Sequence, residues 1–501
     1  MLDSNMKLVM KHSISILAIA ATALLVSCEK FLDEKPQSEL TKEATEVSSL
    51  ESAYKTVSDA QSELNGVYAL FKADIYEACN YYFGDCMTDN CYIGGDGVNE
   101  EQFDNIALTA TNSLIGIMWS QYYAVVGSAT NVIENTKLMD SSIIDDVTRA
   151  QIIADAKFAR AYVLFDIVRL WGAAPMALLL IPSITAENLD EWYPIMYPAR
   201  TSEDDIYKQI LEDLDQSTID NLPSKNHGAF SGSKGAAYAL LAKVYATMGE
   251  KSTRDYNKVI EYCQKVENEG YSLVDNFDDL WTVTNKFSSE SIFEMYFSDA
   301  AEQHNWAYWV LLSDKSGDVV VSWRRYCTPT QDLLAKYDKD NDVRYGSSFY
   351  WASVPYDTYY PAKNYPLAYK IRQKESDIIL MRLADILLLK AEALVETGNY
   401  KEAMEIVNNK IRSRAHVAAI NATSADQARL AVENERQLEL VLEGQRWFDL
   451  VRNDRLEAVM KTAHDKNGNL RFTEIPSWRQ KFPIPQDQID INERLTQNEG
   501  Y

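Results

Sequence analysis

The sequence is short of positive charge. Its 501 residues include 49 lysines and arginines against 74 aspartates and glutamates, and the formal net charge at pH 7 is −25. An acidic surface repels the phosphate backbone of nucleic acids, so this composition excludes nucleic acid as a partner. With 46% hydrophobic residues the chain is still long enough to bury a large core.

Metal-binding patterns are also lacking. Cys79, Cys86 and Cys91 follow no zinc spacing, and no histidine lies near them in the sequence. With Cys263 and Cys327 they make five cysteines beyond the N-terminal region. A disulfide among them is possible in an exported protein, and their odd number leaves one thiol unpaired unless two chains cross-link.

The N-terminus predicts export. Lys7 and Lys11 precede an apolar run from Ile14 to Val26, which is too short to span a bilayer but has the size of a signal-peptide core. The run ends in Leu-Val-Ser-Cys at residues 25–28, which resembles the site cut by the lipoprotein signal peptidase. We expect residues 1–27 to be removed and Cys28 to become the lipidated first residue. Translation starts at Met1 or at Met6.

Helical periodicity dominates the rest of the chain. It covers residues 50–78 and returns over 152–170, where apolar side chains on two faces predict a helix inside the fold. Two helical hairpins follow, over residues 237–263 and 386–411. Recurring pairs of this kind indicate tetratricopeptide-type stacking. The predicted fold class is mainly α: a tetratricopeptide-type helical repeat scaffold with an irregular, aromatic-rich loop region and a few short strands.

Two stretches break the helical rhythm. Residues 80–97 predict a long irregular loop, and its three close glycines fit neither a dinucleotide site nor a phosphate-binding loop, so we expect no cofactor. After a predicted short strand at Ser291–Phe297, periodicity is lost and large rings gather. They are Trp306, Tyr308, Trp309, Trp323, Tyr326, Tyr350, Trp351, Tyr356, Tyr359 and Tyr360. So many rings outside helices indicate a loop-built surface over the scaffold.

The segment Glu435–Arg452 carries an apolar stripe and an acidic stripe, which predict one helix with a core face and a charged face. The acidic stripe consists of Glu435, Glu439 and Glu443. We expect Arg436 and Arg446 to pair with these carboxylates and the Trp447–Phe448 pair to be buried, which gives the helix a structural role. The alternative to this structural role is general acid–base catalysis by the three glutamates.

This segment resembles the C-terminal signature helix of the SusD/RagB family, the lipid-anchored nutrient-binding proteins on the surface of Bacteroidota. Four other stretches share the resemblance: Glu29–Pro36, Lys157–Gly172, Phe482–Asp490 and Leu495–Tyr501. The family has a proline where Glu499 stands. The resemblance implies one domain over residues 28–501, with a helical scaffold at about 40–285 and 375–460, a variable ligand-facing region at about 286–374 and a family tail at 480–501.

The resemblance implies a binding protein and not an enzyme: a cell-surface lipoprotein, anchored in the outer membrane, that captures an oligosaccharide and delivers it to a SusC-like TonB-dependent transporter. Aromatic and polar side chains would contact the ligand. They are Asp89, Asn90, Tyr92, Trp306, Tyr308, Trp309, Trp323, Arg325, Tyr326 and Trp351. Three alternatives stay open: capture of peptides, as in RagB-like proteins, a tetratricopeptide scaffold that binds protein segments, and a glycoside hydrolase with two carboxylates at a defined separation.

Overall fold

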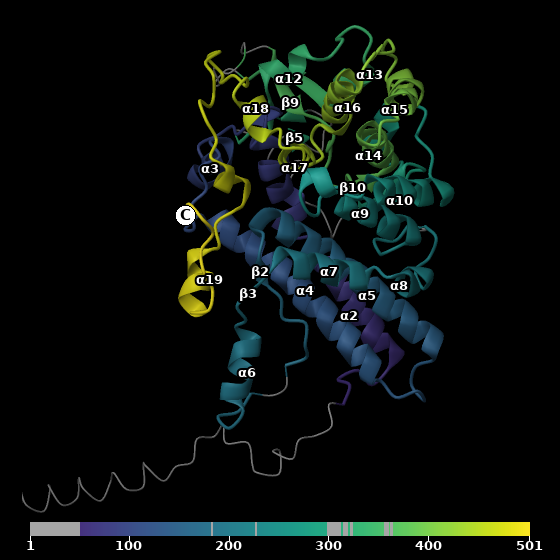
Figure 1. Cartoon of the computed structure of the whole chain (residues 1–501), viewed down its shortest axis with the longest axis vertical. Helices are drawn as coiled ribbons and strands as arrows, with labels where there is room; N and C mark the ends of the chain where they lie inside the picture. The colour runs from purple at the N-terminus through teal and green to yellow at the C-terminus, as the bar shows by residue number, and fades with distance from the viewer. Residues whose placement is uncertain are drawn as a thin grey trace, which may run out of the picture. The chain divides into compact units, whose positions relative to one another are not determined.

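The computed structural model describes residues 51–181, 184–225, 228–297, 324–354, 360 and 364–501, and the backbone of 312–313 and 319–320. Residues Ser52–Tyr501 form one compact unit that is mainly helical, with strands in pairs, which confirms the predicted fold class (Figure 1). Among the described residues, none of the helices combines the length and the apolar character that a bilayer crossing requires. The predicted signal peptide and Cys28 lie outside the described residues.

Three long helices pack against one another in the N-terminal half. They are α2 (Val57–Phe71), α4 (Ser113–Leu138) and α5 (Asp146–Trp171). Helix α5 begins where the Asp145 carboxylate accepts hydrogen bonds from the amides of Val147 and Thr148. Its apolar residues are buried on both faces, and Trp171 at its end is fully buried. The prediction of an internal helix is therefore confirmed.

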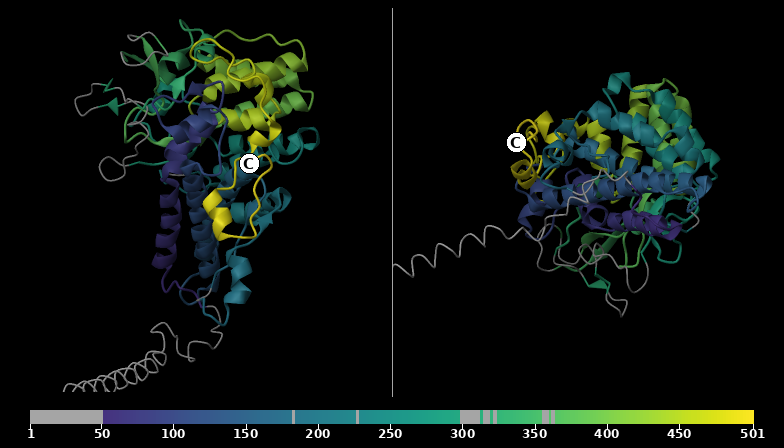
Figure 2. Two further views of the ribbon diagram at one scale, coloured as in Figure 1. Left: turned by 90° about the vertical axis from the view of Figure 1, so that its left-hand side faces the viewer. Right: turned by 90° about the horizontal axis from the view of Figure 1, so that it is seen from below.

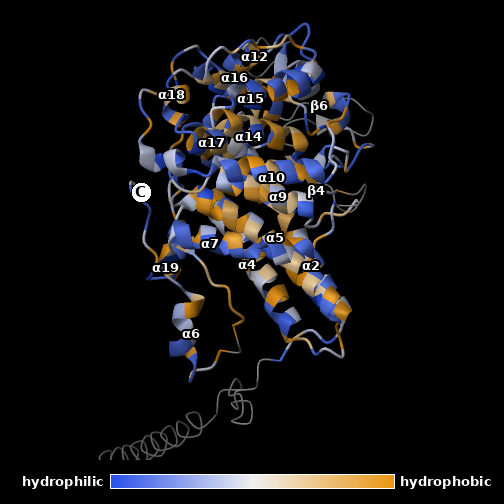
Figure 3. Cartoon of the chain, turned by 45° about the vertical axis from the view of Figure 1, so that its right-hand side comes forward, coloured by the Kyte–Doolittle hydropathy of each residue, from blue (hydrophilic) through white to orange (hydrophobic). Residues whose placement is uncertain are grey.

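Both predicted hairpins are present. Helix α9 (Lys234–Tyr245) pairs with α10 (Tyr256–Asn268), and α14 (Leu383–Glu396) pairs with α15 (Tyr400–Ile406). Helix α10 also packs against α14, so the hairpins lie one above the other, as tetratricopeptide-type pairs do (Figure 3). Gly398, in the turn of the second hairpin, has a φ of +88°, which favours glycine.

The remaining helical elements lie outside the three long helices and the two hairpins. The α-helices are α3 (Val98–Asp104), α6 (Leu189–Met196), α7 (Glu203–Asp213), α8 (Gln216–Asp220), α12 (Gln331–Ala335), α13 (Val343–Ser348), α16 (Ala425–Leu440), α17 (Arg446–Arg452), α18 (Leu456–Met460) and α19 (Gln486–Ile491). π-Helical turns occupy Ile75–Cys79, Tyr82–Cys86 and Val407–Arg412, and 3₁₀ turns occupy Lys251–Thr253, Phe277–Trp281 and Ser477–Gln480.

The strands of the described residues form two-stranded antiparallel sheets. The predicted strand is β4 (Ser291–Met295), and it pairs with β10 (Ile378–Arg382). The other pairs are β1 (Cys91–Tyr92) with β7 (Thr328–Pro329), β2 (Ala174–Pro175) with β3 (Arg200–Thr201), β5 (Leu312–Ser313) with β6 (Val319–Val320), and β8 (Phe349–Ala352) with β9 (Tyr365–Ala368). The β1–β7 and β4–β10 pairs join segments far apart in the sequence, and so they tie the aromatic-rich region to the helical scaffold.

The prediction of one long loop at residues 80–97 is partly wrong. The chain stays helical through a π-helical turn at Tyr82–Cys86, which is buried along its whole length, and leaves helical geometry only after it. A π-helix has more residues per turn than an α-helix, so its buried side chains do not keep the apolar period of 3.6 residues by which helices are recognised in a sequence.

The segment Glu435–Arg452 is two helices, not one. Helix α16 ends at Leu440 and α17 begins at Arg446, and between them Leu442 and Gly444 have φ of +63° and +71°. The Asp85 carboxylate holds this break, because it accepts hydrogen bonds from the amides of Leu442 (3.0 Å) and Gly444 (2.9 Å). The acceptor comes from the other end of the chain, so the local pattern gave no sign of the break.

The glutamate stripe of α16 is buried and paired with arginines from other elements. The Glu439 carboxylate accepts hydrogen bonds from Arg344 (3.1 Å), Arg382 (2.7 Å) and Arg414. Burial raises the pKa of a carboxyl group, but these guanidinium groups outweigh it and hold the pKa of Glu439 well below its usual range. Glu435 pairs with Arg344 and Glu443 with Arg382, so the whole stripe is neutralised inside the protein.

The expected partners of Arg436 and Arg446 were therefore wrong. Arg436 pairs with Asp385 (2.8 Å) and with Asp449, and Arg446 pairs with Asp89 (2.8 Å). The structural role of the segment is confirmed, since its charged side chains and the Trp447–Phe448 pair are buried.

The C-terminal tail crosses the end of α5. The Phe482 amide donates to the Leu170 carbonyl (2.7 Å), and the Trp171 indole N–H donates to the Pro483 carbonyl (3.0 Å). The Asn498 side-chain amide donates to the carbonyls of Trp171 and Phe482. These bonds fix the tail to the scaffold.

Gly84 makes a close contact that predicts a loss of stability on substitution. A β-carbon at this position would lie 2.3 Å from the Gly444 Cα, and backbone atoms cannot move aside as a flexible side chain can. We expect Gly84→Ala to lower the free energy of unfolding by about 2 kcal/mol or more in urea denaturation. The matched control is Gly66→Ala on the exposed side of α2, where a β-carbon meets nothing within 4 Å. It should be neutral or stabilising by about 0.5–1 kcal/mol. Equal stability of the two variants would contradict the contact.

Glu294 on β4 predicts a pH dependence of stability. Burial raises its pKa to about 8, and the neighbouring Asp377, which pairs with Lys286 (2.5 Å), adds to the shift. Between about pH 4.5 and 8 the folded chain therefore binds a proton that the unfolded chain releases. The contribution of this group to the free energy of unfolding falls as pH rises through that range, by at most about 1.4 kcal/mol per pH unit.

We expect Glu294→Gln to remove this slope from the pH dependence, measured by urea denaturation from about pH 5 to about pH 8. The control Glu261→Gln, in an exposed ion pair of α10, should keep the wild-type slope. The assignment fails if the wild type and Glu294→Gln lose stability in parallel over this range.

Candidate ligand-binding site

Two irregular segments meet to form what we call the loop platform, defined as residues 89–97 and 324–330. The β1–β7 ladder joins them, with Cys91 opposite Pro329 and Tyr92 opposite Thr328. Two further backbone bonds extend the junction: the Gly94 amide donates to the Arg325 carbonyl (3.2 Å), and the Thr330 amide donates to the Asn90 carbonyl (2.9 Å). In Figure 2 the segments after β7 lie beside the chain that follows α2.

Gly94 permits the close approach of the two segments. A β-carbon at this position would lie 2.5 Å from the Arg325 carbonyl oxygen, which is closer than real β-carbons approach backbone atoms. Gly94 therefore serves the packing of backbone on backbone.

Asp89 and Asn90 are the first residues of the platform and connect it to the C-terminal helices. Asp89 Oδ1 accepts a hydrogen bond from Arg446 Nε (2.8 Å), and its Oδ2 accepts one from Gln437 (2.8 Å). The pKa of Asp89 is held well below its usual range, because the Arg446 charge outweighs the effect of burial. The Asn90 side chain donates to Asp85 (2.8 Å) and accepts from Gln437 (2.9 Å). Ligand contact by Asp89 and Asn90 stays a prediction; the contacts seen are structural.

Tyr92, Arg325 and Tyr326 are buried in the platform as well. The Tyr92 hydroxyl donates to the His464 carbonyl (2.8 Å), and burial raises the pKa of this tyrosine. The Tyr326 ring lies 5.6 Å from that of Tyr82, and burial raises its pKa to about 12. Arg325 has a φ of +41°, so the chain turns sharply at the point where the two segments meet. The structure thus brings five of the predicted residues together, from two segments far apart in the sequence.

Trp351 lies on β8 and is half-buried, with its ring 6.0 Å from that of Tyr345. Strand β9, the partner of β8, packs against β7, so Trp351 belongs to the same neighbourhood. The predicted residues Trp306, Tyr308, Trp309 and Trp323 lie outside the described residues. Trp323 directly precedes platform residue Arg324 in the sequence.

Three further residues lie in or beside the platform but were not among the predicted ligand contacts, although Tyr360 was one of the rings assigned to the loop-built surface. The Arg324 guanidinium lies 5.7 Å from the centre of the Tyr326 ring, and the Glu100 carboxylate helps to raise the pKa of Tyr326. The Tyr360 hydroxyl donates to the Pro329 carbonyl (2.7 Å). The pair of adjacent arginines at 324 and 325 was a usable signal for Arg324. Glu100 gave no signal, because only folding brings α3 beside Tyr326.

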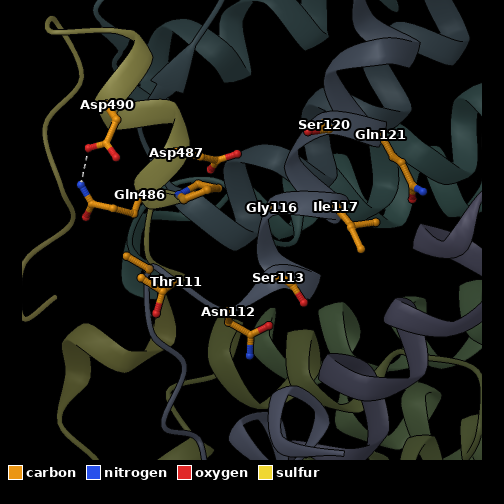
Figure 4. A pocket seen from close by; sticks show the side chains of 12 residues that line it. Thr111, Asn112, Ser113, Gly116, Ile117, Ser120, Gln121, Gln486, Asp487 and Asp490 are labelled. Carbon is orange, nitrogen blue, oxygen red and sulfur yellow. Dashed lines mark hydrogen bonds between the residues drawn. The ribbon is translucent and has the colours of Figure 1, made fainter.

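A cleft of about 680 Å³ lies away from the loop platform, between α4 and α19 (Figure 4). Its lining includes Ser113, Ile117 and Ser120 from α4, and Gln486, Asp487 and Asp490 from α19. The lining residues within the described chain include no aromatic ring, so this cleft does not offer the flat apolar surface on which sugars stack. In the described part of the chain, no group of three or more histidine, cysteine or acidic side chains is placed to hold a metal ion.

The fold and the platform define the class of the protein: a tetratricopeptide-type helical scaffold that carries a loop-built surface. Residues 215–501 match the SusD family, and residues 30–246 match the family described as starch-binding and associating with the outer membrane. The chain belongs to the SusD family, which confirms the resemblance seen in the sequence.

Similar proteins cover nearly the whole chain. A SusD-like protein of Bacteroides ovatus is 24% identical over 525 residues, which span 93% of this chain and 90% of the relative. A SusD superfamily structure from Bacteroides vulgatus has a TM-score of 0.74 at 23% identity and covers 89% of this chain and 100% of its own. Surface glycan-binding protein A of Bacteroides thetaiotaomicron, solved in complex with laminarihexaose, has a TM-score of 0.72 at 21% identity, covering 88% of this chain and 99% of its own.

Asp89 offers a test of the structural contacts under the platform. We expect Asp89→Asn to leave the buried Arg446 without its charge partner and to lower the free energy of unfolding by about 3 kcal/mol in urea denaturation at neutral pH. The control is Asp96→Asn in the same loop, where the aspartate is exposed, and it should change stability by less than about 0.5 kcal/mol. If both variants are as stable as the wild type, the Asp89–Arg446 pair does not hold the platform.

Proposed function

We propose that this protein is a cell-surface lipoprotein that binds a glycan and delivers it to a SusC-like TonB-dependent transporter in the outer membrane. Family membership supports the proposal, as do the starch-binding, outer-membrane-associated family matched by residues 30–246 and the structural neighbour solved with laminarihexaose. The lipid on Cys28 would anchor the chain on the extracellular side of the membrane.

One observation in this chain carries the proposal: platform residues 324–330 lie within the ring-rich region between β4 and β9, and rings on either side of them in the sequence are attached to the platform. Trp323 is bonded to platform residue Arg324, and Tyr360 donates a hydrogen bond to Pro329. Half-buried Tyr350 and Trp351 lie on β8, next to the β9 strand that packs against β7. Rings held in this way offer flat apolar faces to a sugar, and neighbouring polar groups bind its hydroxyls.

The platform chemistry supports binding without bond cleavage. Glycoside hydrolysis requires one carboxyl group that donates a proton and a second that acts as base or nucleophile. Asp89, the buried acidic residue of the platform, is held as a carboxylate by Arg446. It therefore has no proton to give near neutral pH.

Binding can be tested by calorimetry on the mature chain with Cys28 replaced to prevent lipidation. The neutral glycans laminarihexaose and maltohexaose would be compared with anionic polygalacturonate. We expect one neutral glycan to bind, and Trp351→Ala and Trp323→Ala to weaken it about tenfold or more, because each removes a stacking surface. The matched control is Tyr193→Ala on α6, an exposed ring remote from the platform, which should bind as the wild type does (Figure 1).

The other outcomes separate the alternatives. Binding of basic peptides and of no glycan would favour the peptide-capturing, RagB-like function. Binding of protein segments in the groove of the hairpins, unchanged by Trp351→Ala, would favour a tetratricopeptide interaction scaffold. New reducing ends after long incubation with the bound glycan would contradict a role limited to binding.

A further inference from the structure

Three cysteine side chains converge under the loop platform. Cys86 ends the π-helical turn Tyr82–Cys86, Cys91 lies on β1, and Cys327 directly precedes β7. All three are buried, and the sulfur atoms of Cys86 and Cys327 are 3.7 Å apart. The folding of two distant segments into the β1–β7 ladder produces this cluster, so its sequence spacing gave no sign of it.

Cys327 is the centre of the cluster. Burial alone raises the pKa of a thiol, but hydrogen bonds from the Cys86 and Cys91 thiols lower the pKa of Cys327 to about 6. The Cys86 thiol also contacts the Tyr326 carbonyl (3.2 Å). Cys327 is therefore the thiol of the cluster that ionises first, and a thiolate is the nucleophile in disulfide exchange.

The separation of Cys86 and Cys327 is compatible with a covalent bond. A disulfide requires a sulfur–sulfur distance of about 2.05 Å, so the two atoms would have to approach by roughly 1.7 Å when the bond forms. The remaining cysteines are buried elsewhere: Cys79 on the preceding π-helical turn and Cys263 on α10.

We propose that Cys86 and Cys327 form a disulfide in the exported protein, which fastens the second segment of the loop platform to the π-helical turn, while Cys91 stays a thiol beside it. The proposal rests on export, which belongs to the proposed function. The oxidant is the disulfide of a thiol–disulfide oxidoreductase of the cell envelope. Because the sulfurs are buried once the platform has closed, the exchange takes place late in folding, when Cys86 and Cys91 already lie beside Cys327 and the donor disulfide can still reach it.

The thiol–disulfide exchange proceeds in two steps that conserve electrons and protons. The Cys327 thiolate attacks one sulfur of the donor disulfide, forms a mixed disulfide and releases one donor thiolate. Cys86 then loses its proton, attacks the Cys327 sulfur and displaces the second donor thiolate. Two protein thiols lose two electrons in all, the donor disulfide gains them, and the two protons end on the donor thiols.

The bond would act on the ligand-facing surface. It would link residues 241 positions apart, and the adjacent positions 327 and 328–329 would be held by the disulfide and by the β1–β7 ladder respectively. Trp323, which directly precedes Arg324 in the sequence, would then be attached to a fixed base. A cross-link over so long a loop chiefly restricts the unfolded chain, so it is expected to stabilise the folded platform.

The test counts the free thiols of the protein by mass spectrometry. The mature chain with Cys28 replaced is reduced, unfolded and refolded in a buffer of reduced and oxidised glutathione, then unfolded in guanidinium with excess N-ethylmaleimide. We expect about three adducts per chain, and about five after prior reduction, together with a Cys86–Cys327 cross-linked peptide in a digest. A Cys91–Cys327 peptide, or five adducts without reduction, would overturn the proposal.

Variants make the assignment specific. Cys79→Ser should keep the cross-linked peptide, and Cys327→Ser should lose it. A reducing agent should lower the melting temperature of the wild type by several degrees. The same agent should leave that of Cys327→Ser unchanged. Should Cys327→Ser fail to fold, the wild-type peptide map still decides the question. Adduct masses do not depend on ligand binding, so a failure of glycan binding would not be mistaken for a failure of the disulfide.

Discussion

The buried charges of α16 are the constraint on which the rest of this structure depends. A carboxylate in the interior is strongly unfavourable unless it is paired, and Glu439 is paired with guanidinium groups from three other parts of the chain. Arg344 comes from α13, Arg382 ends β10, and Arg414 follows the π-helical turn after α15. All three elements must be in place before the charges of Glu439 and its arginine partners are fully paired. The network therefore selects one packing of α13 and β10 on the helical scaffold, beyond what apolar contact alone would specify.

A second constraint joins the two ends of the chain. The break between α16 and α17 exposes backbone amides that would otherwise continue the helix, and the Asp85 carboxylate accepts two of them. Gly84 lies against Gly444 at the same point, so two backbones touch where side chains would keep them apart. Asp89 then reaches Arg446 four residues later. The loop platform is thus positioned by the most buried part of the C-terminal half, and its place is set by the core.

The sequence allowed the repeating helices to be predicted, because each hairpin buries its own stripe and the period of that stripe is local. It did not allow the partners of Glu435, Glu439 and Glu443 to be predicted, since any of many arginines could have reached them. For the site, the pattern selected two segments far apart in the sequence, and the structure brings them together. The sequence pattern did not predict burial. Asp89 and Tyr92 lie in an irregular stretch, which suggests exposed side chains, whereas hydrogen bonds to Arg446 and to the His464 carbonyl hold them inside the protein.

A rigid base under a ring-rich surface has an energetic consequence for the proposed function. Binding must offset the ordering of every group that contacts the ligand, so rings attached to a platform that is already fixed lose less entropy on binding than rings on a free loop. The platform residues Asp89, Asn90 and Tyr92 contribute to this rigidity through their buried hydrogen bonds. Many lysine and arginine side chains are paired with carboxylates inside the protein, and the net charge of −25 disfavours polyanionic ligands near the surface. Stacking on rings requires no charge on the ligand, so the same protein can hold a neutral glycan without opposing its own field.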